Sequence, residues 1–536
     1  MRELAERWQE RRAVSRRGFL KASAAASAGV MAASCGGTSH ASNDGRGVVV
    51  VGGGIAGLHC AFRLKQLGLN PYVFDANDRL GGRMFTDRQT FPNGQHCELG
   101  GELIGTGHET LRDLADEFDL TLLDYSTLDP SLSHLRALFG GKLIPEADVL
   151  EGYAPIAAAI DDALSVLHDP DGYITYHDPN GAEALDQLSM SAWFDSIGAS
   201  GPVRQLLEVA YVGEYGLEAD VTNVLNLMLL ISTDTTNFEI FGDSDERFHT
   251  ASGNDSFPSR LAGQLDPTRI FTGHRLIAIR QLGDGRYETI YQRDSGTVAA
   301  RCDHLVLALP FTLLREVDIF LPLPDVKRNA IQNLGYGTNS KLMCGFDSRY
   351  WYGLGSDGET YSDLGYQNTW DTSRLQVGDT GILTNFVGGQ AGIAMGDGTT
   401  ESQRDAFLTQ IEQVLPGAAA SSNGATVRYV WPTFALTKGS YASYKVGQYS
   451  TIAGAEIERF DNVHFCGEHT SLDFQGYMEG GALTGAMAAD EIAADMGLTP
   501  AAATLSAPAR RVMQRARTVR ASHKRLAALR RAQRGR

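Results

Sequence analysis

The feature that most constrains the fold is a run of valines followed by a glycine-rich turn near the start of the chain. Residues 47–57 read Gly-Val-Val-Val-Val-Gly-Gly-Gly-Ile-Ala-Gly, and consecutive β-branched residues of this kind predict a buried strand. Gly52, Gly54 and Gly57 have the spacing of a turn that directs backbone N–H groups and a helix N-terminus toward a pyrophosphate. The segment therefore predicts a dinucleotide-binding α/β fold, and an ordinary strand–turn–helix is the alternative.

The residues that follow this turn strengthen the prediction. A helix is expected over residues 55–67, and the next strand, residues 72–74, leads directly to Asp75. This acid lies 21 residues after Gly54, where a carboxylate can accept hydrogen bonds from both hydroxyls of an adenosine ribose. Because the glycines and the acid occur together, we expect a nucleotide rather than a purely structural turn.

Length, charge and cysteine content restrict the class of protein. A chain of 536 residues, 43% of them apolar, is large enough for two or three lobes. The net charge of −17 argues against nucleic-acid binding. The six cysteines show neither paired nor metal-ligand spacing, so no disulfide framework and no metal site is predicted. There is no apolar run of about 18 residues, the length of a membrane-spanning helix.

The amino end looks like a targeting segment. Residues 15–21, Ser-Arg-Arg-Gly-Phe-Leu-Lys, resemble a twin-arginine export signal and precede a mildly apolar stretch. We therefore expect residues 1–41 to be a signal peptide and the mature protein to be periplasmic or extracellular. Cys35 stands in a weakly lipobox-like context that lacks the usual leucine, so a lipid anchor is an open alternative. A disordered basic leader is the other.

Two further glycine motifs point to one family. Residues 80–83 read Leu-Gly-Gly-Arg and residues 97–101 read Cys-Glu-Leu-Gly-Gly. Paired glycines allow close backbone approach, and Arg83 supplies a cation for a phosphate. With the nucleotide-binding segment, these motifs resemble the flavin amine oxidases, which include monoamine, polyamine and L-amino-acid oxidases. The resemblance implies FAD and an α/β fold in which a Rossmann-like FAD-binding domain is interleaved with an α+β substrate-binding domain.

The resemblance extends over about residues 47–497 and implies a division of the chain. It places the FAD-binding domain in residues 46–107, 246–312 and 431–497. The substrate-binding domain would comprise residues 108–245, which have a mostly helical pattern, and residues 313–430.

The chain ends in a basic tail, residues 498–536. Apolar residues of this tail, among them Val512, Ala516 and Val519, recur at nearly helical spacing between arginines. They predict either an amphipathic helix on an anionic surface or a solvated tail.

A lysine within a predicted strand is a candidate catalytic residue. Lys341 precedes the apolar run Leu-Met-Cys, and burial of an ammonium group is costly. On sequence alone it is either an edge-strand lysine facing water or a functional group. In the resembled family, a lysine in this context holds a water against flavin N5, and we favour that role.

Residues 439–444, Gly-Ser-Tyr-Ala-Ser-Tyr, resemble the monoamine oxidase segment in which a cysteine bonds the flavin. Ser440 stands in the position of that cysteine. Because a hydroxyl cannot form the thioether, we expect non-covalent FAD. By the same resemblance, Tyr441 is one ring of an aromatic cage around the substrate, and Trp431, ten residues earlier, lies beside the flavin ring.

The most specific motif is Phe-Cys-Gly-Glu-His-Thr at residues 465–470, followed by Gly-Tyr-Met-Glu-Gly at residues 476–480. By resemblance, Glu468 bonds the ribityl or phosphate region, Tyr477 is the second cage ring, and Met478 presents its backbone N–H to the flavin. The helix that follows directs its N-terminal dipole toward the flavin O2 edge. The other residues expected at the cofactor are Ile55, Ala56, Ala76, Gly100, Gly101, Glu102, Leu276 and Gly467.

The chemistry implied by the resemblance is oxidation of an amine by hydride transfer to flavin N5. Tyr441 and Tyr477 would form a slot that aligns the nitrogen lone pair, and the amine can lose its proton on entering an apolar site. The expected products are an imine, hydrolysed to an aldehyde or keto acid plus ammonia, and hydrogen peroxide from molecular oxygen. Oligomerisation is left open.

The substrate class depends on one difference from the family pattern. L-Amino-acid oxidases usually have an arginine soon after E-L-G that clamps the substrate carboxylate. Here that region contains Glu102 and no arginine; an acid would repel a carboxylate and could attract a second ammonium. We therefore expect a primary amine or polyamine substrate. The alternatives are an L-amino-acid oxidase that uses an arginine from another segment, a flavoprotein without oxidase activity, and a desaturase or porphyrinogen-type oxidase, although the last two fit the lysine and paired tyrosines less well.

Overall fold

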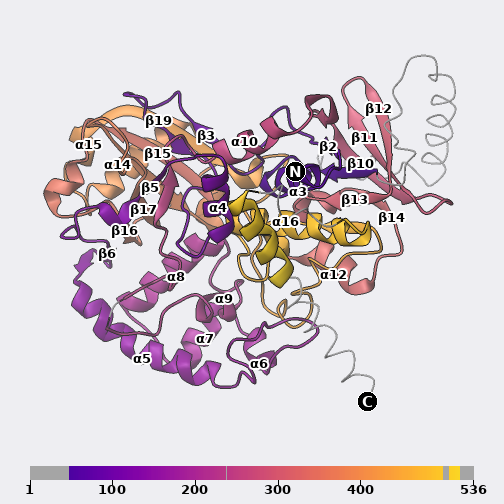
Figure 1. Cartoon of the computed structure of the whole chain (residues 1–536). Helices are drawn as coiled ribbons and strands as arrows, with labels where there is room; N and C mark the ends of the chain where they lie inside the picture. Colours follow the sequence, from indigo (N-terminus) through magenta and orange to yellow (C-terminus); the bar gives the residue numbers. More distant parts are fainter. Residues whose placement is uncertain (1–46, 237, 499–505, 520–536) are drawn as a thin grey trace, which may run out of the picture.

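The computed structural model describes residues 47–236, 238–498 and 506–519 (Figure 1). The twin-arginine segment, Cys35 and residues 520–536 lie outside this range, so export, cleavage and lipid anchoring stay predictions. None of the helices within the described residues is both long and apolar enough to cross a membrane.

A five-stranded parallel sheet forms the centre of the first lobe. The valine run is β1 (Val48–Val51), whose four residues are all buried. It pairs on one side with β2 (Tyr72–Phe74) and on the other with β13 (His304–Leu307). The outer strands are β9 (Ile270–Phe271) and β20 (Val463–Phe465). Because these strands come from three distant parts of the chain, the predicted interleaved two-lobe α/β fold is confirmed.

Helices α3 (Ile55–Gln66), α10 (Ser256–Gln264) and α16 (Met478–Asp495) pack on one side of this sheet. The contact between α3 and α16 is close because it uses small residues: a Cβ on Gly485 would lie 2.3 Å from the carbonyl oxygen of Ala56. The predicted helix after the glycine turn is therefore held by the last long helix of the family region.

A second sheet packs on the other face and lies apart from the helical region in Figure 1. Its order is β12 (Gly296–Cys302), β11 (Tyr287–Arg293), β10 (Arg275–Gln281) and β14 (Asp318–Phe320). Helix α12 (Asp325–Asn333) packs into the same core through Ala330 and Ile331. The predicted domain boundaries, including the one at residue 312, stay predictions.

The second lobe contains a seven-stranded sheet and a helical group. The sheet order is β19 (Ser422–Val430), β15 (Ser340–Phe346), β18 (Gly381–Val387), β17 (Asn368–Asp371), β16 (Thr360–Ser362), β6 (Arg136–Phe139) and β7 (Lys142–Ile144). The main helices are α5 (Glu146–Leu164), α6 (Glu183–Asp186), α7 (Met190–Ser196), α8 (Pro202–Tyr215), α9 (Val224–Met228), α13 (Gly389–Ala394), α14 (Thr400–Ile411) and α15 (Ala418–Ser421). Figure 1 shows α5–α9 grouped below the sheet.

Short strand pairs and one helix connect the lobes. The pairs are β3 (Thr86–Asp87) with β4 (Cys97–Glu98), and β5 (Leu122–Asp124) with β8 (Phe248–Thr250). Helix α4 (Glu109–Glu117) packs against α16, and the side chain of Glu479 accepts hydrogen bonds from the backbone N–H groups of Thr110 and Leu111, both at 2.9 Å. This buried carboxylate caps the N-terminus of α4.

The described part of the basic tail is a helix over residues 507–519 that packs on the protein itself. Val512 and Ala516 are buried against Leu483 and Met487 of α16. Its arginines form ion pairs with acids of α4 and α16, including Arg517 with Asp490 at 2.7 Å. This part is therefore neither solvated nor presented as an apolar face, and a contact of the tail with an anionic surface stays a prediction.

Candidate active site

A large cavity runs from the carboxyl ends of the parallel strands to the seven-stranded sheet. Its volume is about 270 Å³, near the lower end of the roughly 300–1,000 Å³ of a typical ligand pocket. The predicted site residues that line it are Gly52, Gly54, Ile55, Ala56, Asp75, Ala76, Arg83, Gly100, Gly101, Glu102, Lys341, Trp431, Tyr441, Gly467, Glu468, Tyr477 and Met478.

Two predicted residues do not line this cavity. Leu276 lies on β10 and faces a small neighbouring cavity that also includes Ala76. Gly57 lies behind the glycine turn, where a Cβ would be 1.9 Å from the carbonyl oxygen of Gly52. Its role is therefore to let the helix approach the turn.

The glycine turn has the geometry of a phosphate-binding turn. Gly52 has a φ of 112°, and a Cβ there would lie 2.4 Å from the carbonyl oxygen of Ala308, so no larger residue fits. The N–H of Gly53 donates to the carboxylate of Asp75 at 2.6 Å. This bond fixes the turn against the end of β2 and places both the turn and the acid on the cavity wall.

Arg83 and Glu468 join the glycine motifs to the carboxyl-terminal motif. Arg83 donates to Glu468 Oε1 at 2.6 Å and to the carbonyl oxygen of Ser440 at 2.8 Å. The N–H of Gly476 donates to the other oxygen of Glu468 at 2.9 Å. The charge of Arg83 is therefore already balanced by a carboxylate at the cavity wall.

A histidine missed by the sequence analysis supports a bound cofactor. Both ring nitrogens of His469 are buried in the cavity wall without a hydrogen-bond partner among the described residues. Burial lowers the pKa of this imidazole well below its ordinary value, so the ring is neutral. Buried polar atoms normally have partners, and a polar cofactor between His469 and the glycine turn would supply them. The residues present thus fit FAD.

Ser440 is buried in the cavity wall and donates to Asn339 Oδ1 at 2.6 Å. The five described cysteines are all buried, and none of them lines the cavity. Neither Ser440 nor a neighbouring thiol can therefore form the thioether, which agrees with non-covalent FAD.

Lys341 lies on β15, an interior strand that is hydrogen-bonded on both sides, by β18 and β19. The alternative of an edge-strand lysine facing water is therefore wrong. Its Nζ donates to Glu102 Oε2 at 2.7 Å and to the carbonyl oxygens of Gly100 and Glu98 at 2.9 and 3.2 Å. Sequence reasoning found the lysine but not this ion pair.

The carboxylate of Glu102 is fully engaged. Its other oxygen accepts hydrogen bonds from Trp370 at 2.9 Å and Thr372 at 2.8 Å. Burial acts to raise the pKa of Glu102, but the charges of Lys341 and His249 and the hydrogen bonds from Lys341 and Trp370 together outweigh it and hold the pKa below its ordinary value. A substrate ammonium would therefore meet an acid that already has a counter-ion, and a substrate-binding role for Glu102 stays a prediction.

The two predicted cage tyrosines converge on one residue. Tyr477 donates from its hydroxyl to Glu214 Oε1 at 3.0 Å, and Tyr441 donates to the backbone carbonyl of Glu214. Burial raises the pKa of both phenols well above the ordinary value, so both rings are neutral. Glu214, at the end of α8, thus positions both rings at the cavity.

Glu214 and Glu246 are acids of the cavity that sequence analysis missed. Burial raises the pKa of Glu214, and burial with the nearby charge of Glu214 raises the pKa of Glu246 to about 8. Glu246 also has a φ of 43°, a conformation that is uncommon outside glycine and often found at functional sites. No spacing distinguishes these glutamates from solvated ones, because only the fold brings α8 and the loop before β8 to the tyrosines.

Two further aromatic residues complete this end of the cavity. Trp370 on β17 and Phe386 on β18 line it with ring centroids 5.4 Å apart, and the Lys341 ammonium lies 5.2 Å from the Trp370 ring. Residues 313–430 contain no motif around them, so sequence analysis gave them no role.

A parallel nucleotide-binding sheet, an interleaved second lobe and an aromatic cavity with a buried lysine define a flavin-dependent oxidoreductase. The chain belongs to the flavin containing amine oxidoreductase family, whose model matches residues 55–493. It is an FAD-dependent amine oxidase, as the motifs predicted.

Known relatives and solved structures cover most of the chain. It is 24% identical to a probable flavin-containing monoamine oxidase A of Dictyostelium discoideum, over 83% of this chain and 97% of that protein. It is also 24% identical to an L-amino acid dehydrogenase of Synechocystis, over 83% of this chain and 94% of that protein. The structure of cyclohexylamine oxidase from Brevibacterium oxydans is similar in fold, with a TM-score of 0.73 and 20% identity over 84% of this chain and 99% of that one.

Proposed function

We propose that the protein oxidises a primary amine that carries a second positive charge, a diamine or polyamine. The amine, oxygen and water give an aldehyde, ammonia and hydrogen peroxide, with an imine as the first product. Bound FAD supplies the two-electron oxidation of the C–H bond next to nitrogen. The observation that supports a dicationic substrate is the pair Glu214 and Glu246 beside the tyrosines.

The residues of the chain have separate tasks in this proposal. The neutral rings of Tyr441 and Tyr477 hold the reacting nitrogen, which enters as the free amine because the cavity wall is largely apolar. The second ammonium lies against Glu246, whose carboxyl is ionised more readily once a cation is bound. Lys341, which lines the same cavity, holds a water.

The arginine distribution supports an amine rather than an amino acid. Among the described residues, the only arginine in the cavity wall is Arg83, which pairs with Glu468 at 2.6 Å. Arg374 does not line the cavity; its guanidinium carbon lies 4.2 Å from the centroid of the Tyr125 ring, and its buried Nε has no hydrogen-bond partner among the described residues. Among the described residues, the cavity wall therefore offers no arginine besides Arg83 to clamp a substrate carboxylate.

The test compares peroxide release from a diamine, a monoamine of similar length and a panel of L-amino acids. We expect Glu246→Gln to lower kcat/KM for the diamine by about 10-fold or more, the effect of losing one charge-assisted contact, and to leave the monoamine nearly unchanged. Glu359→Gln is the matched control, because this acid is near Glu246 but does not line the cavity. Turnover of L-amino acids alone would contradict the proposal and support an L-amino-acid oxidase.

A further inference from the structure

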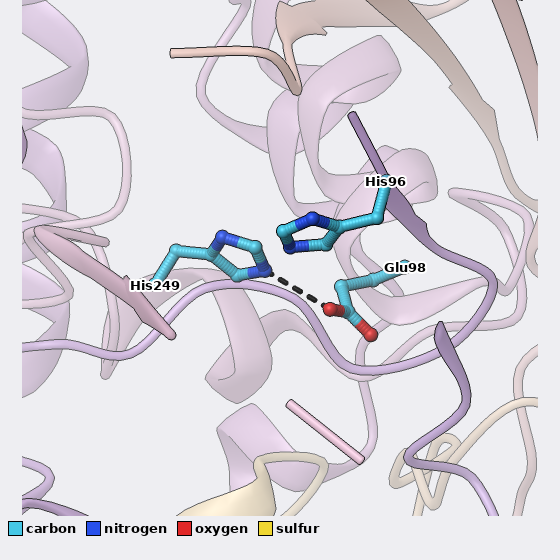
Figure 2. Close-up of side chains that lie close together, drawn as sticks. All are labelled: His96, Glu98 and His249. Atoms are coloured by element: carbon cyan, nitrogen blue, oxygen red, sulfur yellow. Dashed lines mark hydrogen bonds and ion pairs between the residues drawn. The ribbon is translucent and has the colours of Figure 1, made fainter. Parts of the chain in front are cut away.

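Three buried side chains that suit a metal ion lie together outside the FAD and substrate cavity. His96 precedes β4, Glu98 lies on β4 and His249 lies on β8. One ligand atom from each lies within 4.8 Å of those of the other two. Figure 2 shows the two imidazole rings and the carboxylate facing a common gap. None of the three lines the cavity.

We propose that His96, Glu98 and His249 form a zinc-binding site next to the lysine end of the active-site cavity. Two imidazoles and a carboxylate are a ligand set that zinc accepts, with a water in the fourth position. The amine oxidation reaction assigns no task to these residues, so the proposal does not depend on the substrate class.

Each histidine directs one ring nitrogen toward the gap. His96 Nε2 is buried and has no hydrogen-bond partner among the described residues, and His249 Nε2 lies 3.0 Å from Glu98 Oε1. His96 bonds the backbone of Thr250, and metal-binding histidines commonly use the second ring nitrogen in this way.

The carboxylate of Glu98 is held in place by several donors. Glu98 Oε1 lies 3.0 Å from His249 Nε2 and accepts from the N–H of Asn254 at 2.9 Å, while Oε2 accepts from the hydroxyl of Thr86 at 2.8 Å. Zinc bonds of about 2.0–2.2 Å place tetrahedral ligand atoms roughly 3.3 Å apart. The His249–Glu98 pair is close to that spacing before any ion binds, and a ligand atom of His96 lies within 4.8 Å of both.

The site is connected to the catalytic lysine and to the surface. The backbone carbonyl of Glu98 accepts a hydrogen bond from Lys341 Nζ at 3.2 Å, so a metal that fixes β4 also fixes an acceptor of this lysine. On the other side, Gln376 bonds both the N–H and the carbonyl of His96, at 2.9 Å each. The loop over residues 374–380, which contains Gln376, is mostly exposed.

A second histidine cluster in the molecule provides a control. His304 Nδ1 lies 3.3 Å from His464 Nε2, and His464 Nδ1 pairs with Glu491 at 2.9 Å. The nearby Asp495 is paired with Arg459. In this cluster the histidine nitrogens face other groups of the chain, whereas His96 Nε2 faces none.

The test uses the FAD-loaded full-length enzyme, treated with a chelator, dialysed and titrated with Zn²⁺. We expect one zinc per chain by elemental analysis. His96→Gln and His249→Gln should each weaken zinc binding by at least about 100-fold, because loss of an outer-shell partner alone costs about 10- to 100-fold. His304→Gln should bind zinc as the wild type does. Flavin content of each variant reports whether it is folded.

X-ray absorption at the zinc edge of the wild-type protein tests the ligands without any substitution. Two imidazoles and a carboxylate in a four-coordinate site are expected. The proposal is overturned if the wild type binds no zinc, if both variants retain wild-type affinity, or if the spectrum shows cysteine or fewer than two imidazole ligands.

Discussion

The ammonium of Lys341 and the carboxylate of Glu102 are 2.7 Å apart, and both side chains are buried. Lys341 comes from β15, an interior strand of the second lobe, and Glu102 follows the second glycine motif. An ion pair taken out of water depends strongly on its partner. The candidate catalytic lysine therefore also holds the two lobes together at the cavity.

Substitution of this lysine should affect both stability and turnover. We expect Lys341→Met to lower the free energy of unfolding by about 3–5 kcal/mol, because it leaves the Glu102 charge buried and unpaired. Amine oxidation should fall strongly if Lys341 holds a water beside the reacting atoms. Chemical denaturation of the FAD-loaded enzyme and peroxide release measure the two effects.

The double variant Lys341→Met with Glu102→Gln separates the effect on stability from the effect on turnover. Removal of both charges should recover much of the lost stability, while turnover should stay low. Full recovery of turnover in the double variant would contradict a catalytic role for the lysine and leave only a structural one.

Ser440 predicts how the flavin is attached. Acid precipitation of the wild-type enzyme should release all of the yellow cofactor into the supernatant, because no described cysteine lines the cavity. In Ser440→Cys, a fraction of the flavin should stay with the precipitated protein if this position faces the ring. Flavin retained by the wild-type precipitate would show that another residue forms a covalent bond.

The close packing of the glycine turn predicts that FAD binding is lost on substitution of Gly57 but not on substitution of a glycine with free space around it. Gly57→Ala should abolish FAD binding, because its Cβ would lie 1.9 Å from the carbonyl oxygen of Gly52, far inside van der Waals contact. Gly263→Ala on α10 is the control, since no atom of another residue lies within 4 Å of its added Cβ. The ratio of flavin to protein absorbance after purification measures FAD binding in the two variants. An unchanged ratio in Gly57→Ala would contradict the predicted clash.

The sequence predicted the FAD side of the molecule far better than the substrate side. Gly52, Asp75 and Glu468 occur in short motifs because each must meet a fixed part of one cofactor, and the structure places all three on one cavity wall. Local spacing along a strand and turn therefore contains enough information to find them.

The substrate side depends on contacts between distant residues. Glu214 at the end of α8 and Glu246 in a loop resemble ordinary solvated acids until α8 is packed against the segments of Tyr441 and Tyr477. His249 likewise lies 153 residues from His96 in the chain and meets it only through the pairing of short strands. Such sites have no periodicity or spacing in the sequence.

Glu246 should make stability depend on pH. Its pKa is about 8 in the folded chain and 4.5 ordinarily, so between these values the folded state keeps a proton that the unfolded state has lost. Stability from this group is therefore present below pH 4.5 and is lost as the pH rises toward 8. Melting curves of the wild type and Glu246→Gln should agree at pH 4.5, and the variant should be the more stable at pH 8. Curves separated by the same amount at both pH values would contradict the assignment.

The carboxyl-terminal helix should be part of the folded enzyme although it lies beyond the family region. Val512 is fully buried against Leu483 and Met487 of α16, and α16 begins at Met478 in the cavity wall. We expect Val512→Asp to lower the melting temperature and to promote flavin loss, because it buries an unpaired charge at this contact. Gln514→Asp, which adds the same charge at an exposed position of the same helix, should change neither. Equal behaviour of the two variants would mean that the helix detaches in solution and contributes nothing to the cofactor site.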